Sequence, residues 1–240
     1  MHRNQIYSSE FVKEYDRMAF GGYYDYDSIA KVLAGILKDK REILELGIGT
    51  GNVAILLAKC GFSVHGIDYS DEMLEILKNK LKNTGLNMIL QKAGSTNFKF
   101  PDKFDGIFSH GGAITYIHTE KGLFLERAFL DKSDHIRTFK NVACHLKNGG
   151  LFIVNIQQEH SNENVLHLKN GCMYTTKLIF KNGFAIKTHY ILKGKNIIAQ
   201  QIIKAIRLPY KAVKQELEQI GFTNFKIDET KKLVYCSFNV

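Results

Sequence analysis

The feature of this sequence that most limits its fold is a set of glycines placed directly after a short apolar strand. Residues 42–52 read Glu-Ile-Leu-Glu-Leu-Gly-Ile-Gly-Thr-Gly-Asn, and residues 52–60 have a helical pattern. Glycine permits a tight bend and lets a ligand approach the backbone closely. The helix start that follows offers N–H groups without intrahelical partners. The segment therefore predicts the first strand–turn–helix unit of an α/β sheet, with a ligand at the turn.

Strands and helices alternate along the next hundred residues. Short apolar strands are expected at 42–46, 63–67, 88–92, 104–109 and 151–156. Helices are expected at 52–60, 71–82 and 123–146. Such alternation is typical of a doubly wound, mostly parallel sheet with right-handed crossovers and helices on both faces.

Both ends of the chain depart from this alternation. Residues 9–27 are dense in aromatic side chains and predict a short helix, a break at Gly21-Gly22 and a second helix to residue 37. Hairpin strands are expected at 173–180, 184–192 and 196–207, with Asn182-Gly183 and Gly194 at the turns. A helix at 209–220 and strands at 222–227 and 232–238 complete the chain. We expect a helical lid at 1–40 and a sheet domain at 41–240, with an antiparallel meander inserted at about 172–207.

The acids near the glycine turn indicate the charge of the ligand. Glu45 lies on the strand just before the turn, where it suits a cationic ammonium and would repel a pyrophosphate. The glycine spacing, G-x-G-x-G, also differs from the dinucleotide G-x-G-x-x-G, which disfavours a nicotinamide oxidoreductase. Asp68 ends the second strand, where a carboxylate accepts hydrogen bonds from ribose hydroxyls. Tyr69 and Met73 could sandwich an adenine ring or simply pack in the core, and both interpretations stay open.

These motifs resemble those of the class I S-adenosylmethionine-dependent methyltransferases. The resemblance covers residues 43–156 and implies a seven-stranded Rossmann-like sheet whose last strand is antiparallel. It implies that the loop of Gly47, Gly49 and Gly51 holds the methionine part of S-adenosylmethionine, that Asp68 holds the ribose, and that S-adenosylhomocysteine is the product. Many relatives carry an acid after the third strand that binds the adenine amine. Gly94 stands at that place here, so backbone groups or Ser95 are expected to bind adenine.

A narrower resemblance concerns the acceptor side. The N-terminal segment is similar in spacing to the lid of small-molecule N-methyltransferases such as aminosugar N,N-dimethyltransferases and glycine N-methyltransferase, which implies that Tyr15 lies over the cofactor. After the fourth strand comes a polar, glycine-rich segment, with Ser109 beside the cofactor and His110, Tyr116 and His118 as candidate catalytic residues. An amine acceptor needs little base catalysis, whereas a hydroxyl would need a general base such as His110 or His118. No metal site is expected.

The resemblance implies methyl transfer to a nitrogen or oxygen of a small molecule, as in natural-product metabolism, and two alternatives stay open. The net charge is +9, but Lys and Arg are spread along the chain without a block of five or six like charges. The basic excess alone favours an RNA-modifying methyltransferase, although the run after the fourth strand lacks the Asn/Asp-Pro-Pro-Tyr pattern of exocyclic-amine enzymes. A non-catalytic S-adenosylmethionine-binding module is the other alternative. A nucleic-acid partner is not expected, and a homodimer is left open.

Location is expected to be cytoplasmic. No apolar run approaches the roughly 20 residues that a bilayer requires, and the first residues lead into no apolar segment of a secretory signal. The four cysteines, Cys60, Cys144, Cys172 and Cys236, form no C-x-x-C pair, and we expect them to be buried and reduced.

Overall fold

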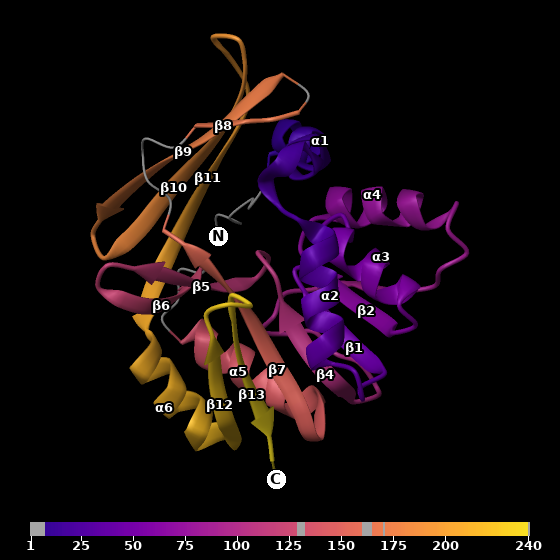
Figure 1. The fold of residues 1–240 in the computed structure, drawn as a ribbon. Coiled ribbons are helices and arrows are strands. Elements are labelled where there is room, and N and C mark those ends of the chain that lie inside the picture. The colour runs from indigo at the N-terminus through magenta and orange to yellow at the C-terminus, as the bar shows by residue number, and fades with distance from the viewer. Residues whose placement is uncertain (1–7, 129–132, 160–164, 170, 240) are drawn as a thin grey trace.

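A doubly wound α/β sheet forms the centre of the molecule in a computed structural model, which describes residues 8–128, 133–159, 165–169 and 171–239 (Figure 1). Parallel pairing joins its first strands, and the last strand of the chain runs antiparallel between two others. Their order across the sheet is β3 (Ile89–Lys92), β2 (Ser63–Asp68), β1 (Glu42–Leu46), β4 (Phe104–Ser109), β7 (Leu146–Gln158), β13 (Leu233–Phe238) and β12 (Phe222–Asp228). The predicted α/β class is confirmed.

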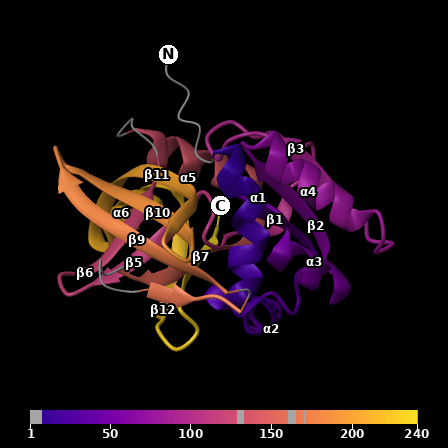
Figure 2. The ribbon, with the colours of Figure 1, turned by 90° about the horizontal axis from the view of Figure 1, so that it is seen from above.

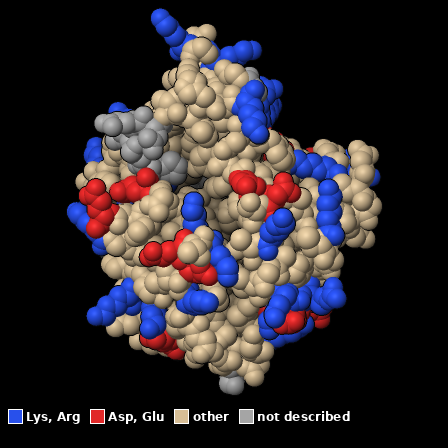
Figure 3. Space-filling view, viewed as in Figure 1, with Lys and Arg blue, Asp and Glu red and all other residues tan. Residues whose placement is uncertain are grey.

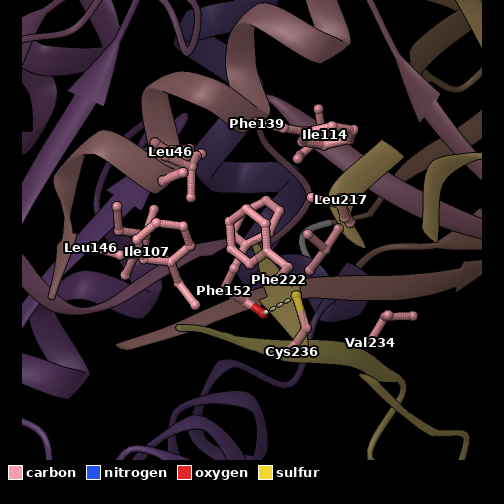
Figure 4. Packing of buried hydrophobic residues seen from close by; sticks show 14 of the residues in the cluster. Leu46, Ile107, Ile114, Phe139, Leu146, Phe152, Leu217, Phe222, Val234 and Cys236 are labelled. Atoms are coloured by element: carbon pink, nitrogen blue, oxygen red, sulfur yellow. Dashed lines mark hydrogen bonds between the residues drawn. The ribbon is translucent and has the colours of Figure 1, made fainter. Parts of the chain in front are cut away.

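Helices cover both faces of this sheet because alternate strand residues point to opposite sides. On one face lie α2 (Tyr26–Ile36), α3 (Asn52–Lys59) and α4 (Asp71–Leu81), packed on residues such as Ile43 and Phe108. On the other face lie α5 (Asp134–His145) and α6 (Tyr210–Ile220). Figure 4 shows this second core, where Phe139 and Leu217 meet Phe152 and Val234 of the sheet.

The N-terminal segment bends at its glycines, as predicted. Helix α1 (Ser9–Met18) leads into a short π-helical turn, η1 (Ala19–Tyr23), before α2 begins. Gly22 has φ +114°, a conformation that residues with a Cβ rarely adopt, so this glycine permits the bend. In the view from above, α1 lies between the late strands and the helices α3 and α4 (Figure 2).

A second set of strands continues from the far end of β7. β5 (Ile114–Thr119) pairs with β7 in parallel at Tyr116–Ile156, and β6 (Gly122–Arg127) forms a hairpin with β5. The meander follows in the order β11 (Asn196–Pro209), β10 (Phe184–Lys193), β9 (Cys172–Lys181) and β8 (Val165–His167). Because β11 pairs with β6, the predicted insert is joined edge to edge with the rest of the sheet rather than packed on it.

Two local predictions are wrong. The helix expected at 123–146 begins only at Asp134, and its first residues instead form β6, which hydrogen-bonds to β5 and β11 on its two sides. Residues 129–132 of that prediction lie outside the described residues, as do residues 1–7 of the expected lid. Cys60 and Cys144 are exposed at the ends of α3 and α5, and only Cys172 and Cys236 are buried. In the described part of the chain, every helix is too short or too polar to cross a bilayer.

Candidate functional site

A cavity of about 1430 Å³ opens where β1, β2 and β4 end, between the sheet and the meander. Small-molecule sites are usually ~300–1,000 Å³, so this volume leaves room for more than one small ligand. Nine of the residues predicted for the site line the cavity: Tyr15, Glu45, Gly47, Gly49, Asp68, Tyr69, Met73, Ser95 and His110.

The glycine turn and Asp68 hold one another in place. One carboxylate oxygen of Asp68 accepts the Gly49 N–H at 2.8 Å, and the other accepts the Ser70 N–H at 2.9 Å. Ser70 caps α4 with its own hydroxyl, so Asp68 is not needed as that helix cap. Burial raises the pKa of Asp68, while the two backbone N–H groups act in the opposite direction. Each oxygen keeps lone pairs that ribose hydroxyls could use.

Glu45 is the most isolated acid of the site. Its residue is 3% exposed, and its Oε2 atom has no hydrogen-bond partner among the described residues. Burial, together with the nearby Asp68 charge, raises the pKa of Glu45 well above its ordinary value. An orphaned carboxylate oxygen of this kind calls for a cationic or hydrogen-bond-donating ligand.

The packing after β3 shows why Gly94 stands where many relatives carry an acid. A Cβ at Gly94 would lie 2.0 Å from the Tyr69 hydroxyl, so any larger residue there would collide with the tyrosine ring. The Ser95 hydroxyl lies 3.0 Å from that of Thr138 on α5, and Arg127 donates to the same Thr138 oxygen at 3.1 Å. Burial lowers the pKa of Arg127 to about 10, which still leaves the guanidinium charged at neutral pH. No local pattern in the sequence predicted a role for Arg127.

His110 belongs to an aromatic group at the centre of the cavity. Its ring meets that of Tyr24 edge to face at 5.4 Å, and Gln157 donates a 2.8 Å hydrogen bond to the Tyr24 hydroxyl. Tyr24 in turn meets Tyr23 at 4.5 Å. Burial lowers the pKa of His110 to about 4, so the imidazole is neutral at pH 7. Tyr23 and Gln157 are cavity residues whose part in the site was not predicted.

Four predicted site residues do not line the cavity. Gly51 caps α3 with φ +76° and faces Leu77, and the Ser109 hydroxyl is bound to the backbone oxygens of Leu46 and Ile114. Tyr116 is buried in the core against Tyr210, because the segment expected as a loop is strand β5. His118 is exposed on that strand. The structure thus brings His110, but not Tyr116 or His118, to the cavity.

One polar side chain of α1, that of Asp16, holds the glycine turn by hydrogen bonds and an ion pair. Asp16 accepts hydrogen bonds from the Thr50 hydroxyl at 2.6 Å and from the Asn52 amide at 3.2 Å. Its second oxygen pairs with the Lys80 ammonium at 2.7 Å. Lys80 also donates to the Thr50 carbonyl at 3.0 Å. These contacts tie the N-terminal segment to the predicted ligand loop, and sequence reasoning missed them.

The meander contributes the wall that faces the sheet. Lys187 and His189 of β10, with Tyr174 of β9, line the cavity there, and Glu126 of β6 lies beside Lys187. The Tyr174 hydroxyl is 2.6 Å from His189 Nδ1. On the face seen in Figure 3, Lys and Arg are interspersed with acids over the surface, and a hollow lies between the late strands and the main sheet.

Comparison with known proteins shows which proteins this chain is similar to. Residues 43–150 match the methyltransferase domain family. The chain is 31% identical over 146 residues to the Bacillus subtilis methyltransferase YqeM, across 61% of this chain and 53% of that protein. Residues 43–150 are therefore similar to a methyltransferase domain, and the chain has the fold of class I methyltransferases.

Two further comparisons also match proteins named as methyltransferases. Rat glycine N-methyltransferase is 28% identical over 159 residues, across 62% of this chain and 50% of its own length. The S-adenosylmethionine-bound structure of CalS10, an amino pentose methyltransferase from Micromonospora echinaspora, superposes with a TM-score of 0.70 at 14% identity, across 98% of this chain and 99% of that one. The chain spans about half the length of the curated relatives it matches.

The cofactor of class I methyltransferases, S-adenosylmethionine, fits the residues of this cavity. It carries an ammonium for the orphaned Glu45 oxygen, ribose hydroxyls for Asp68 and an adenine for the Tyr69 and Ser95 end. Apart from its chain neighbours, no described residue comes within 4 Å of the place where a Cβ of Gly49 would stand, so its backbone is open to a ligand. The donors and acceptors that line this cavity therefore match a sulfonium nucleoside.

Proposed function

We propose that this chain transfers a methyl group from S-adenosylmethionine to an amine nitrogen of a small molecule bound in the same cavity. The observation that carries the proposal is the continuity of the cavity, in which the Glu45–Asp68 end and the polar meander wall enclose one space around His110 and Tyr24. The acceptor would enter between these two ends. Glycine N-methyltransferase and CalS10, both named for amine-bearing substrates, support a nitrogen acceptor.

The chain's own residues would act by binding and alignment. When bound, S-adenosylmethionine supplies a sulfonium methyl that a nucleophile can attack in line, with S-adenosylhomocysteine as the leaving group. Glu45 would hold the ammonium and Asp68 the ribose, and Tyr24 and His110 line the same cavity beside them. Tyrosine faces stabilise nearby cations by ~0.5–2 kcal/mol each. Good alignment of two bound reactants can lower a barrier by up to ~7–11 kcal/mol.

The state of His110 favours an amine over a hydroxyl as the nucleophile. A neutral imidazole can accept a hydrogen bond from an N–H group and so direct the nitrogen lone pair. With a pKa of about 4, it is a weak base for removing a hydroxyl proton, because base catalysis is most effective when the pKa lies near the working pH. A neutral amine has a lone pair that can attack directly. An acceptor that arrives as an ammonium first loses a proton to solvent, and the methylated ammonium can lose its own proton to solvent afterwards.

The test combines cofactor binding with an acceptor screen. Calorimetry with S-adenosylhomocysteine should show binding, and labelled S-adenosylmethionine should transfer its methyl to amines in preference to phenols and carboxylic acids. Asp68→Ala removes the proposed ribose acceptor and the support of the Gly49 N–H, so the dissociation constant should rise more than tenfold. Asp39→Ala, in an exposed loop, is the control. Absence of heat with either form of the cofactor, or unchanged binding by Asp68→Ala, would contradict the proposal.

A further inference from the structure

A buried lysine in the wall of the cavity has no role in the chemistry described so far. Lys187 projects from β10, and its side chain is only 9% exposed although it lines the cavity. The strand residue paired with it is Ile203, which lines the same wall together with Ala205. A lysine ammonium is strongly hydrated in water, so burial among apolar side chains is costly unless negative charge compensates it.

Within the protein, the negative charge of Glu126 is shared between two cations, Lys187 and Arg207. Glu126 accepts Lys187 with one oxygen at 2.9 Å and Arg207 with the other at 2.8 Å. Although burial alone would raise it, the pKa of Glu126 is lowered by the charges of Lys187 and Arg207. Arg207 also pairs with Glu159, whose side chain is 34% exposed and therefore partly screened by water. The buried part of the cluster thus holds two positive charges and one negative charge.

Of the two cations in this cluster, Lys187 is the one that faces the cavity. Lys187 and Glu126 line the cavity, whereas Arg207 and Glu159 do not. An ammonium carries three N–H donors, and one of them is used by Glu126. His189, two residues further along the same face of β10, lines the cavity as well and is fixed by its hydrogen bond to Tyr174. At the opposite end of the cavity, Glu45 and Asp68 are acidic and would be taken by the cationic cofactor.

We propose that Lys187 forms an anion-binding subsite of the acceptor pocket, and that the methyl acceptor is a small amine that also carries an acidic group, a carboxylate or a phosphate. The inference rests on the proposed function and names the substrate class for it. The acidic group would bind at the meander wall and hold the amine toward His110 and Tyr24. In a cavity of low polarity, a charge-assisted contact of this kind is stronger than at the surface.

The test uses the full chain saturated with S-adenosylhomocysteine, with acetate and inorganic phosphate as separate probes. Wild-type protein should bind at least one of them, measured by calorimetry and by the rise in melting temperature. Lys187→Met should weaken that binding at least tenfold, and Lys187→Arg should restore most of it. Lys204→Met, which alters an exposed lysine of the neighbouring strand, is the matched control and should bind as wild type does. Preference for acetate would identify a carboxylate group, and preference for phosphate a phosphorylated acceptor.

A second variant separates ligand binding from a structural role. Glu126→Gln removes the negative charge that competes for Lys187, so anion binding should become tighter, whereas a purely structural ion pair would give no such gain. In methyl transfer, β-alanine and ethanolamine phosphate should have lower KM values than β-alaninamide and ethanolamine, and Lys187→Met should remove the difference.

Three results would overturn the inference: no anion binding by the wild-type complex, equal binding by Lys187→Met, or equal KM values for acidic and neutral amines. Failure of the protein to bind S-adenosylhomocysteine at all would instead contradict the proposed function.

Discussion

At the scale of single residues, the site depends on acids whose surroundings differ although their positions are close. Asp68 has two backbone N–H groups as partners, and Glu45 has a carboxylate oxygen with none among the described residues. Asp68 is therefore preorganised to bind hydroxyl groups, and Glu45 is a buried acid suited to bind a cation. His110, between them and the meander, is kept neutral by burial.

Cofactor affinity should depend on pH through Glu45. Its pKa is raised well above the ordinary value, so the carboxylate becomes protonated as pH falls through a range above the usual one for glutamate. The ammonium of S-adenosylhomocysteine is attracted only by the ionised form, so its dissociation constant should rise as pH falls through the raised pKa. Glu45→Gln should bind at least tenfold more weakly at neutral pH and should lose most of this pH dependence, as measured by calorimetry between pH 5 and pH 8.

The control for that experiment is Glu42→Gln, at the other end of the same strand and away from the cavity. A pH profile of Glu45→Gln that follows the wild-type curve would assign the dependence to another group and remove Glu45 from the ammonium site.

At the scale of elements, two turns meet through glycines. A Cβ at Gly47 would lie 2.6 Å from the Ala113 nitrogen, and a Cβ at Gly112 would lie 2.5 Å from the Gly47 oxygen. The turn after β1 and the turn after β4 therefore touch backbone to backbone. This contact closes the sheet side of the cavity, and only glycine fits on either side of it.

Substitution in the first turn should distinguish packing from conformational strain. Gly47→Ala must adopt φ +73° and also collide with backbone atoms, so the free energy of unfolding should fall by about 2–5 kcal/mol. Gly49→Ala has φ +54° but open space around the added methyl, so the loss should be only about 1–2 kcal/mol. Urea denaturation of the two variants measures the difference, and equal losses would show that the contact with Ala113 contributes nothing.

At the scale of the whole molecule, α1 connects the two walls of the cavity. Ser9 donates to Glu72 of α4 at 2.7 Å, and the Ser8 N–H donates to Gln201 of β11 at 2.6 Å. Phe11 packs in a small core with Tyr174 of the meander. The N-terminal segment thus spans the sheet and the meander above the ligand loop, which suits it to control entry to the cavity (Figure 2).

Asp16→Ala should release the N-terminal segment from the ligand loop. The variant removes the hydrogen bonds to Thr50 and Asn52 and leaves Lys80 without its carboxylate. Hydrogen bonds to charged groups contribute roughly 1.5–3 kcal/mol, so amide exchange across residues 9–18 should accelerate at least tenfold and S-adenosylhomocysteine should dissociate faster. Glu14→Ala, on the same helix and paired with Arg17, is the control. Unchanged exchange would mean that Asp16 does not hold the segment in place.

The sequence by itself determined the sheet, the glycine turn and the acids at its edge, because these follow from local patterns. A strand of Ile and Leu, a glycine that must adopt positive φ and a carboxylate at a strand end are each legible within about ten residues. The tertiary structure decided the rest. Residues 123–127 became a strand because β5 and β11 pair with both of its edges, and among the candidates His110, Tyr116 and His118 only His110 reached the cavity, because the following segment is a strand that continues into the core. The Lys187–Glu126 pair joins residues 61 positions apart, a contact set by strand pairing that no local pattern can reveal.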